Sequence, residues 1–225
     1  AYVMRGSIAA RQGHEEQALA LYSKAIEMDP GSTGPAAYNQ IGSLRFRSGE
    51  FSEAREAFQA AIKIDALNGQ ARSGLASILI EEDKLDEAKR ELALALRFDP
   101  NQPHALAVLG SLLSREGDQD QAMRACQRAL ELSPKSPQAH NAMGLVCRRQ
   151  DRFEEAEKHY LQAIEESPRF AAAYVNLAQL YVRQDREEQA IEQLRKAVGG
   201  NHSKPNPVAL ATLGAHFLDR KDPAR

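Results

Sequence analysis

The 225-residue chain contains no tryptophan, only two cysteines and no run of eighteen apolar residues. The missing apolar run argues against a membrane-spanning helix, and two cysteines are too few for a disulfide framework or a cysteine metal site. Neither charge sign is in excess, because 29 Lys and Arg stand against 31 Asp and Glu, which gives a net charge of −2. Nucleic-acid-binding domains usually carry a positive excess, so that class is disfavoured.

The motifs of common enzyme classes are also missing. The sequence has no phosphate-binding loop, no GxGxxG, no GxSxG and no HExxH. Its six histidines are scattered, and His140 falls on a position expected to line a helix core, which favours packing over metal binding. Glutamate pairs such as Glu154 and Glu155 recur where helices are expected to start, so they are interpreted as helix-start charge. The sequence therefore predicts no enzyme activity, no cofactor and no metal site.

What the sequence does contain is a repeat of short period. The skeleton of RRQDRFEEAEKHYLQAIEESP, residues 148–168, returns in RQGHEEQALALYSKAIEMDP, residues 11–30. One alanine marks each copy at a nearly constant spacing, namely Ala18, Ala54, Ala88, Ala122, Ala156 and Ala190. A small residue earlier in each copy keeps the same rhythm: Gly6, Gly42, Ala76, Gly110, Gly144, Ala178 and Gly214. Such a period predicts similar units stacked into an array.

Each unit holds two helical patterns separated by a turn. In the second copy Ile41 and Leu44 lie on one apolar face, and Phe58 and Ile62 lie on another. Gly49 between them can adopt the positive φ of a helix C-cap. Because the helices of a hairpin approach to roughly 8–10 Å, the small residues are expected at the crossing, with large residues beside them: Tyr22, Phe58, Leu92, Tyr160 and Leu194. One hairpin cannot bury both its faces, so neighbouring units must stack.

This pattern resembles the tetratricopeptide repeat, a helix–turn–helix unit of about 34 residues. Clear copies are AYNQIGSLRFRSGEFSEAREAFQAAIKID, AHNAMGLVCRRQDRFEEAEKHYLQAIEESP and AYVNLAQLYVRQDREEQAIEQLRKAV. The resemblance implies an all-α fold, a right-handed superhelical solenoid of helix–turn–helix hairpins. It implies a single array over 1–225, with a partial or capping helix at 207–222 and units at about 1–34, 35–68, 69–102, 103–136, 137–170 and 171–206.

The resemblance also implies a binding surface, because the first helices of the family line the concave face of the array. The thirteenth position of the unit carries an arginine in five of six units, and Arg148 lies beside one of them. Such a row of guanidiniums suits acidic side chains or a carboxylate terminus, although a solvated basic position explains it equally well. Asparagines nearby can hydrogen-bond a ligand main chain. The predicted groove residues are Arg47, Arg115, Arg148, Arg149, Arg183, Asn39, Asn141, Asn176, Phe46, Ser77 and Ser111.

The sequence thus predicts a non-enzymatic scaffold that binds a protein or peptide segment of acidic character in its concave groove. A bacterial pilus, secretion or other envelope assembly is suggested as the setting by analogy. Two alternatives stay open, the substrate-recruiting segment of a larger transferase and a scaffold that forms homo-oligomers through its open ends. No nucleic-acid partner and no membrane insertion is predicted. A soluble segment in the cytoplasm or at a bacterial periplasm or envelope fits equally well.

The two cysteines are expected on helices that pack together. Cys126 occupies the large-residue position of a second helix, and Cys147 occupies a core position of the following first helix. They are interpreted as small buried side chains, with a disulfide as the alternative.

Overall fold

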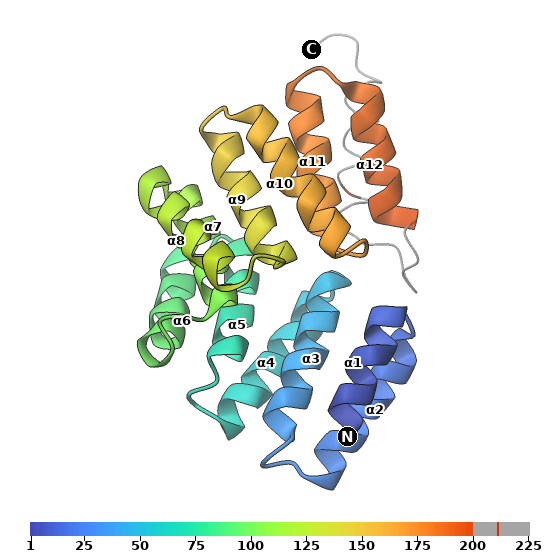
Figure 1. Ribbon diagram of the computed structural model, residues 1–225. Helices are drawn as coiled ribbons and strands as arrows, with labels where there is room; N and C mark the ends of the chain where they lie inside the picture. The colour runs from blue at the N-terminus through green and yellow to red at the C-terminus, as the bar shows by residue number, and fades with distance from the viewer. Residues whose placement is uncertain (200–210, 212–225) are drawn as a thin grey trace.

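The computed structural model describes residues 1–199 and Ala211, and every regular element in that part of the chain is an α-helix. The twelve helices form six consecutive hairpins (Figure 1), which confirms the all-α solenoid. We call these hairpins units 1 to 6. The predicted helix at 207–222 lies outside the described residues. The helices are α1 (Tyr2–Gln12), α2 (Glu15–Met28), α3 (Gly34–Arg47), α4 (Phe51–Ile64), α5 (Gly69–Glu81), α6 (Leu85–Phe98), α7 (Pro103–Glu116), α8 (Gln119–Leu132), α9 (Pro137–Arg149), α10 (Phe153–Glu166), α11 (Ala171–Arg183) and α12 (Glu187–Gly199).

The two helices of every unit are joined by the same tight turn. In each turn the residue that follows the left-handed residue donates its backbone N–H to the carbonyl five residues back, as Arg152 N does to Cys147 O at 3.0 Å. Each first helix therefore ends in a Schellman motif. Glycine adopts the left-handed conformation of this turn at no steric cost, and aspartate is one of the few other residues that tolerate it. The prediction that Gly49 ends a helix is confirmed. The left-handed residues are Gly13, Gly49, Asp83, Gly117, Asp151 and Asp185.

The small residues of the repeat lie where the two helices of a unit cross. The six marker alanines of the second helices are all 0% exposed. In unit 5 a methyl group added to Gly144 would lie 2.6 Å from the ring of Tyr160, well inside van der Waals contact. In unit 6 the equivalent residues are Ala178 and Leu194, and both are buried. A larger residue on one helix is therefore matched by a smaller one on its partner, as the sequence predicted.

Successive units stack, and the stacking curves the array. Each second helix packs on the following first helix, and the first helices of neighbouring units also contact one another, from α1–α3 to α9–α11. Successive second helices make no comparable contact in the described part of the chain. The first helices therefore lie on the inner side of the curve. Buried apolar clusters cross the unit boundaries, one from Ala54 to Leu112 and one from Leu106 to Ala197, so no single closed core exists among the described units.

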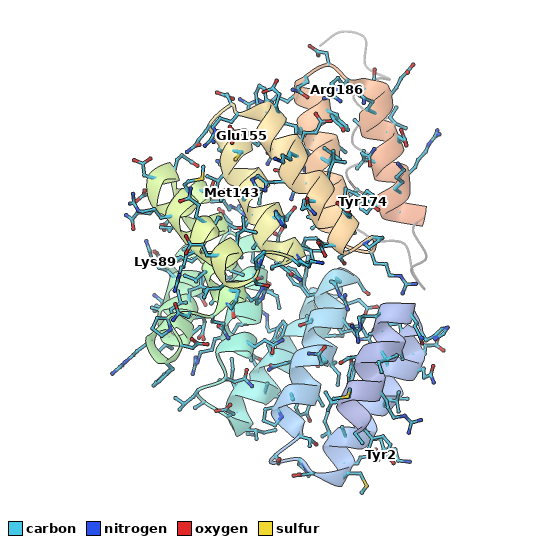
Figure 2. All side chains as sticks on the ribbon, viewed as in Figure 1. Tyr2, Lys89, Met143, Glu155, Tyr174 and Arg186 are labelled. Atoms are coloured by element: carbon cyan, nitrogen blue, oxygen red, sulfur yellow. The ribbon has the colours of Figure 1, made fainter. Side chains whose placement is uncertain are left out.

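Polar side chains add links between units. Arg186, labelled in Figure 2, lies in the turn before α12. It binds the carboxylate of Glu157 on α10 at 2.7 Å and so joins units 5 and 6. Its guanidinium also lies 4.1 Å from the ring centroid of Tyr181. The ion pair holds the pKa of Glu157 below its usual range. These contacts fix the sixth unit on the fifth through both charge and aromatic surface.

The curvature brings the two ends of the array together. Arg169, in the turn between α10 and α11, donates from Nη2 to the carbonyl of Gln12 (2.9 Å) and from Nη1 to that of Ala10 (3.5 Å). Both carbonyls belong to the last turn of α1, where a cation is favoured by the negative end of the helix dipole. Figure 1 shows the blue and the orange ends of the array approaching each other. Arg169 thus links the fifth unit to the first.

Candidate functional site

Two arginines of the predicted row bind carboxylates of the preceding unit. Arg115 donates to Asp83 Oδ1 (3.0 Å) and to the carbonyl of Ile80 (2.6 Å), at the end of α5. Arg183 donates to Asp151 Oδ1 at 2.8 Å. Both aspartates are left-handed turn residues, so the turn that ends one first helix supplies the carboxylate for the arginine of the next unit. The charges of these two arginines are therefore compensated within the chain.

Arg47 lies where the two ends of the array meet. It is half-buried, and Glu15, Tyr22 and Arg169 are close enough to act on it electrostatically. Burial lowers the pKa of the Arg47 guanidinium from its usual value. Arg47 is therefore part of the contact between units and is left out of the binding surface proposed below.

Arg148 and Arg149 are the remaining predicted arginines, and both lie at the end of α9. Arg148 donates to Gln179 Oε1 of α11 at 2.9 Å, so it bridges units 5 and 6. Arg149 is exposed and makes no hydrogen bond or ion pair with any residue that the structure describes. Among the predicted groove arginines, Arg149 is the one whose charge has no such partner in the described part of the chain.

The three asparagines of the prediction fall into two groups. Asn39 is 4% exposed, and its Nδ2 donates to Oδ1 of Asn68, the N-cap of α5, at 3.0 Å. Asn141 and Asn176 are half-buried, and Asn176 Nδ2 donates to Asn141 Oδ1 at 2.9 Å. Within the described residues, Asn141 Nδ2 and Asn176 Oδ1 make no hydrogen bond. This pair therefore keeps one donor and one acceptor for a ligand, whereas Asn39 serves the stacking of units 2 and 3.

The other predicted residues contribute surface and no chemistry. The ring centroids of Phe46 and Phe51 lie 5.4 Å apart, and both rings pack against the buried cluster of units 2 to 4. The hydroxyls of Ser77 and Ser111 each donate to the carbonyl four residues earlier in their own helix, at 3.0 and 3.2 Å. Phe46 is therefore a partly buried residue at the edge of the core, and the serines offer small side chains whose hydroxyl hydrogens are already donated.

The turn residues were missed by sequence reasoning. Asp83, Gly117 and Asp151 occupy the same position of three successive repeats, so aligning the turns would have shown aspartate alternating with glycine. That alignment does not reveal which arginine reaches which turn, because each such ion pair spans 32 residues and crosses a unit boundary.

The described part of the chain offers little reactive chemistry. It holds no group of three or more His, Cys, Asp or Glu side chains able to bind a metal ion. Cys126 and Cys147 are both buried and both free, so the alternative of a disulfide is not seen. Burial raises the pKa of the Cys126 thiol to about 12, which keeps it protonated and unreactive near neutral pH. No helix among the described residues is long and apolar enough to cross a membrane.

Stacked helix hairpins with a continuous core make this protein an α-helical repeat solenoid. Comparison with known families agrees, because four models described as tetratricopeptide repeat match residues 1–32, 45–112, 103–146 and 135–200. The chain belongs to the tetratricopeptide repeat family.

The solved structures that match this chain are distant in sequence. YrrB, described as a TPR protein with an unusual peptide-binding site, is 23% identical, and the match covers 87% of this chain and 97% of YrrB with a TM-score of 0.47. Two structures of MamA match with TM-scores of 0.44, at 23% and 24% identity, covering 74% and 71% of this chain and 91% and 93% of theirs. The comparison with curated proteins returned no match.

Proposed function

We propose that this chain is a non-catalytic scaffold that docks an acidic peptide or protein segment on the first helices of units 4 to 6. The amide pair of Asn141 and Asn176 carries this proposal, because it keeps one donor and one acceptor outside its own hydrogen bond. An extended segment presents the matching carbonyl and N–H groups along its backbone.

Charge and architecture support the same surface. Arg148 and Arg149 lie on α9, the helix that carries Asn141, and favour an acidic segment. The first helices occupy the inner side of the curve, which is where arrays of this family bind their partners. A multiprotein assembly is the setting in which such docking would act, and a bacterial pilus or secretion complex is the working hypothesis for it.

Affinity capture with groove variants tests the docking function. The bait is the purified chain, and the variant carries Asn141→Leu and Asn176→Leu together. Replacing both partners of a hydrogen bond by apolar groups of similar size is nearly neutral for stability, so helicity should be unchanged by circular dichroism. We expect the variant to recover at least about ten-fold less of the captured partner, because a ligand backbone would lose two hydrogen bonds.

The matched control replaces two amide side chains by leucine on second helices. Gln59→Leu and Gln127→Leu change two exposed amides of α4 and α8, and this control should capture as well as the unmodified chain. Equal capture by the groove variant and the control would contradict docking at the amide pair.

A further inference from the structure

Neighbouring units differ in how the arginine at the end of a first helix is neutralised. At the step from unit 3 to unit 4, Arg115 binds Asp83, and at the step from unit 5 to unit 6, Arg183 binds Asp151. The step between them, from unit 4 to unit 5, carries Arg149 at the same position of the repeat. The residues Arg115, Arg149 and Arg183 thus share one position of the repeat, and the preceding turn supplies a carboxylate for two of them.

Gly117 explains the missing carboxylate. It occupies the left-handed position of the turn with φ 95°, where Asp83 and Asp151 have φ 61° and 58°. Apart from the neighbouring residues along the chain, no described atom lies within 4 Å of the point where a Cβ added to Gly117 would be. The place that an aspartate side chain fills in the neighbouring turns is open here.

Nearby groups do not replace the missing aspartate as a partner for Arg149. The carboxylate of Asp118 is turned toward the start of α8, where it accepts from the backbone and side chain of Gln121. The carbonyl of Ser114, equivalent to the one that Arg115 binds at Ile80, already accepts from Gln119 Nε2 at 3.0 Å. At the step between units 4 and 5, the turn therefore has no carboxylate for the arginine, and the equivalent carbonyl is already occupied.

We propose that Arg149 and the open turn at Gly117 form a carboxylate socket, in which an acidic group of the docked segment takes the place that Asp83 and Asp151 fill in the neighbouring turns. This proposal rests on the docking function proposed above and names the contact that selects acidic partners. The guanidinium offers a fork of donors that matches a carboxylate. A side-chain carboxylate and a terminal carboxylate have the same chemistry, so the experiment separates them.

The test measures binding of small probes to the purified chain. The Arg149 Nε–Hε signal, assigned by its loss in Arg149→Lys, is followed by NMR. One probe is acetyl-Gly-Ser-Glu-Glu-Gly-Ser amide, which has side-chain carboxylates only. The other is acetyl-Gly-Ser-Gly-Ser-Gly-Ser with a free carboxyl terminus. We expect millimolar binding of at least one probe, and the one that binds more tightly identifies the source of the carboxylate.

Gly117→Asp is the decisive variant, because it restores the aspartate of the neighbouring turns. A carboxylate tethered beside Arg149 has a local concentration above that of a millimolar probe, so we expect binding at least about ten-fold weaker. Gly49→Asp is the charge-matched control, since Glu81, and not an arginine, occupies the equivalent position there, and it should bind as the unmodified chain does.

Asp83→Gly gives an independent test that does not depend on how well Gly117→Asp folds. Removing Asp83 should free Arg115 Nη2, while Nη1 stays on the carbonyl of Ile80, and should produce a second arginine signal that responds to the same probe. The socket is refuted by any one of three results. These are that neither probe shifts the Arg149 signal, that Gly117→Asp binds the probe as tightly as the unmodified chain, or that no probe shifts the Arg115 signal in Asp83→Gly. Such results with an intact effect of the Asn141 and Asn176 substitutions on capture would reject the socket and keep the docking function.

Discussion

At the scale of single residues, the identity of one side chain in a unit sets the size of another. Gly144 lies against the ring of Tyr160, whereas Ala178 accompanies the smaller Leu194 at the equivalent positions of unit 6. Protein interiors are packed as densely as crystals, so a crossing of two helices has room for a fixed total volume. Units 5 and 6 exchange the sizes of the two members in this way, whereas unit 4 pairs Gly110 with the small Cys126.

The exchange can be tested in unit 5. Gly144→Ala should lower the free energy of unfolding by about 1–3 kcal/mol, the usual cost of an overpacked core, because the added methyl meets the Tyr160 ring. Combining it with Tyr160→Leu, which copies unit 6, should recover part of the loss. Urea unfolding followed by circular dichroism measures both effects. A double variant less stable than the sum of the two single changes would contradict volume matching.

At the scale of helices, two histidines join α9 to α10. His140 Nε2 lies 2.9 Å from the carbonyl of Pro134, and His140 Nδ1 lies 3.1 Å from His159 Nδ1. A carbonyl can only accept, so His140 donates from Nε2, and its neutral Nδ1 accepts from His159. The contact therefore ties the start of α9 to the middle of α10.

This arrangement predicts a loss of stability in mild acid. Burial and the neighbouring His140 lower the pKa of His159, and burial lowers that of His104 to about 4. In the unfolded chain these histidines have a pKa near 6.5, so on acidification they bind protons there before they do in the folded chain. Their contribution to stability is therefore complete above pH 6.5 and is lost as the pH drops toward 4. Carboxylates in ion pairs, such as Glu157, titrate only below their ordinary value of 4.5.

Urea unfolding at pH 7 and pH 5 checks the histidine contribution. The double variant His104→Gln and His159→Gln should lose less stability between these two pH values than the unmodified chain does. His14→Gln, which replaces an exposed histidine before α2, serves as the control and should leave the pH dependence unchanged. An identical loss in the double variant and the unmodified chain would assign the acid sensitivity to other groups.

At the scale of the whole molecule, the curvature accumulates over five units until Arg169 reaches α1. The guanidinium is seated against the turn at Gly13, where an added Cβ would collide with Arg169 Nη1. The close fit means that the left-handed glycine serves both the turn and the contact between units 1 and 5. We expect the contact to limit how far the array can open, and so to set the space available on the inner side of the curve.

Removing the contact should open the array. Arg169→Ala loses the hydrogen bonds to Ala10 and Gln12, and we expect a larger radius of gyration by small-angle X-ray scattering because these bonds link units 1 and 5. Arg72→Ala is the control, since Arg72 binds Glu91 within unit 3 and has the same charge. Equal radii for Arg169→Ala and the unmodified chain would show that the stacking of units alone sets the curvature.

The sequence was sufficient for the helix hairpins and their crossings. The constant period of the repeat, the turn at Gly49 and the buried position of Ala54 all follow from patterns within one unit or its immediate neighbour. Local patterns of this kind depend on helix periodicity and side-chain volume, and both can be read from the residues themselves. The predicted groove arginines were harder to judge, because their availability depends on residues in another unit.

The sequence by itself therefore determined that hairpins of constant length would stack, since no hairpin can bury both its faces. Only the tertiary structure decided that Arg115 and Arg183 meet aspartates, that Arg149 has no hydrogen-bond or ion-pair partner among the described residues, and that Asn39 is buried. The rotation between successive units sets which side chains face each other across a boundary, and its sum over the array brings Arg169 to α1. No pattern within a single repeat contains that rotation.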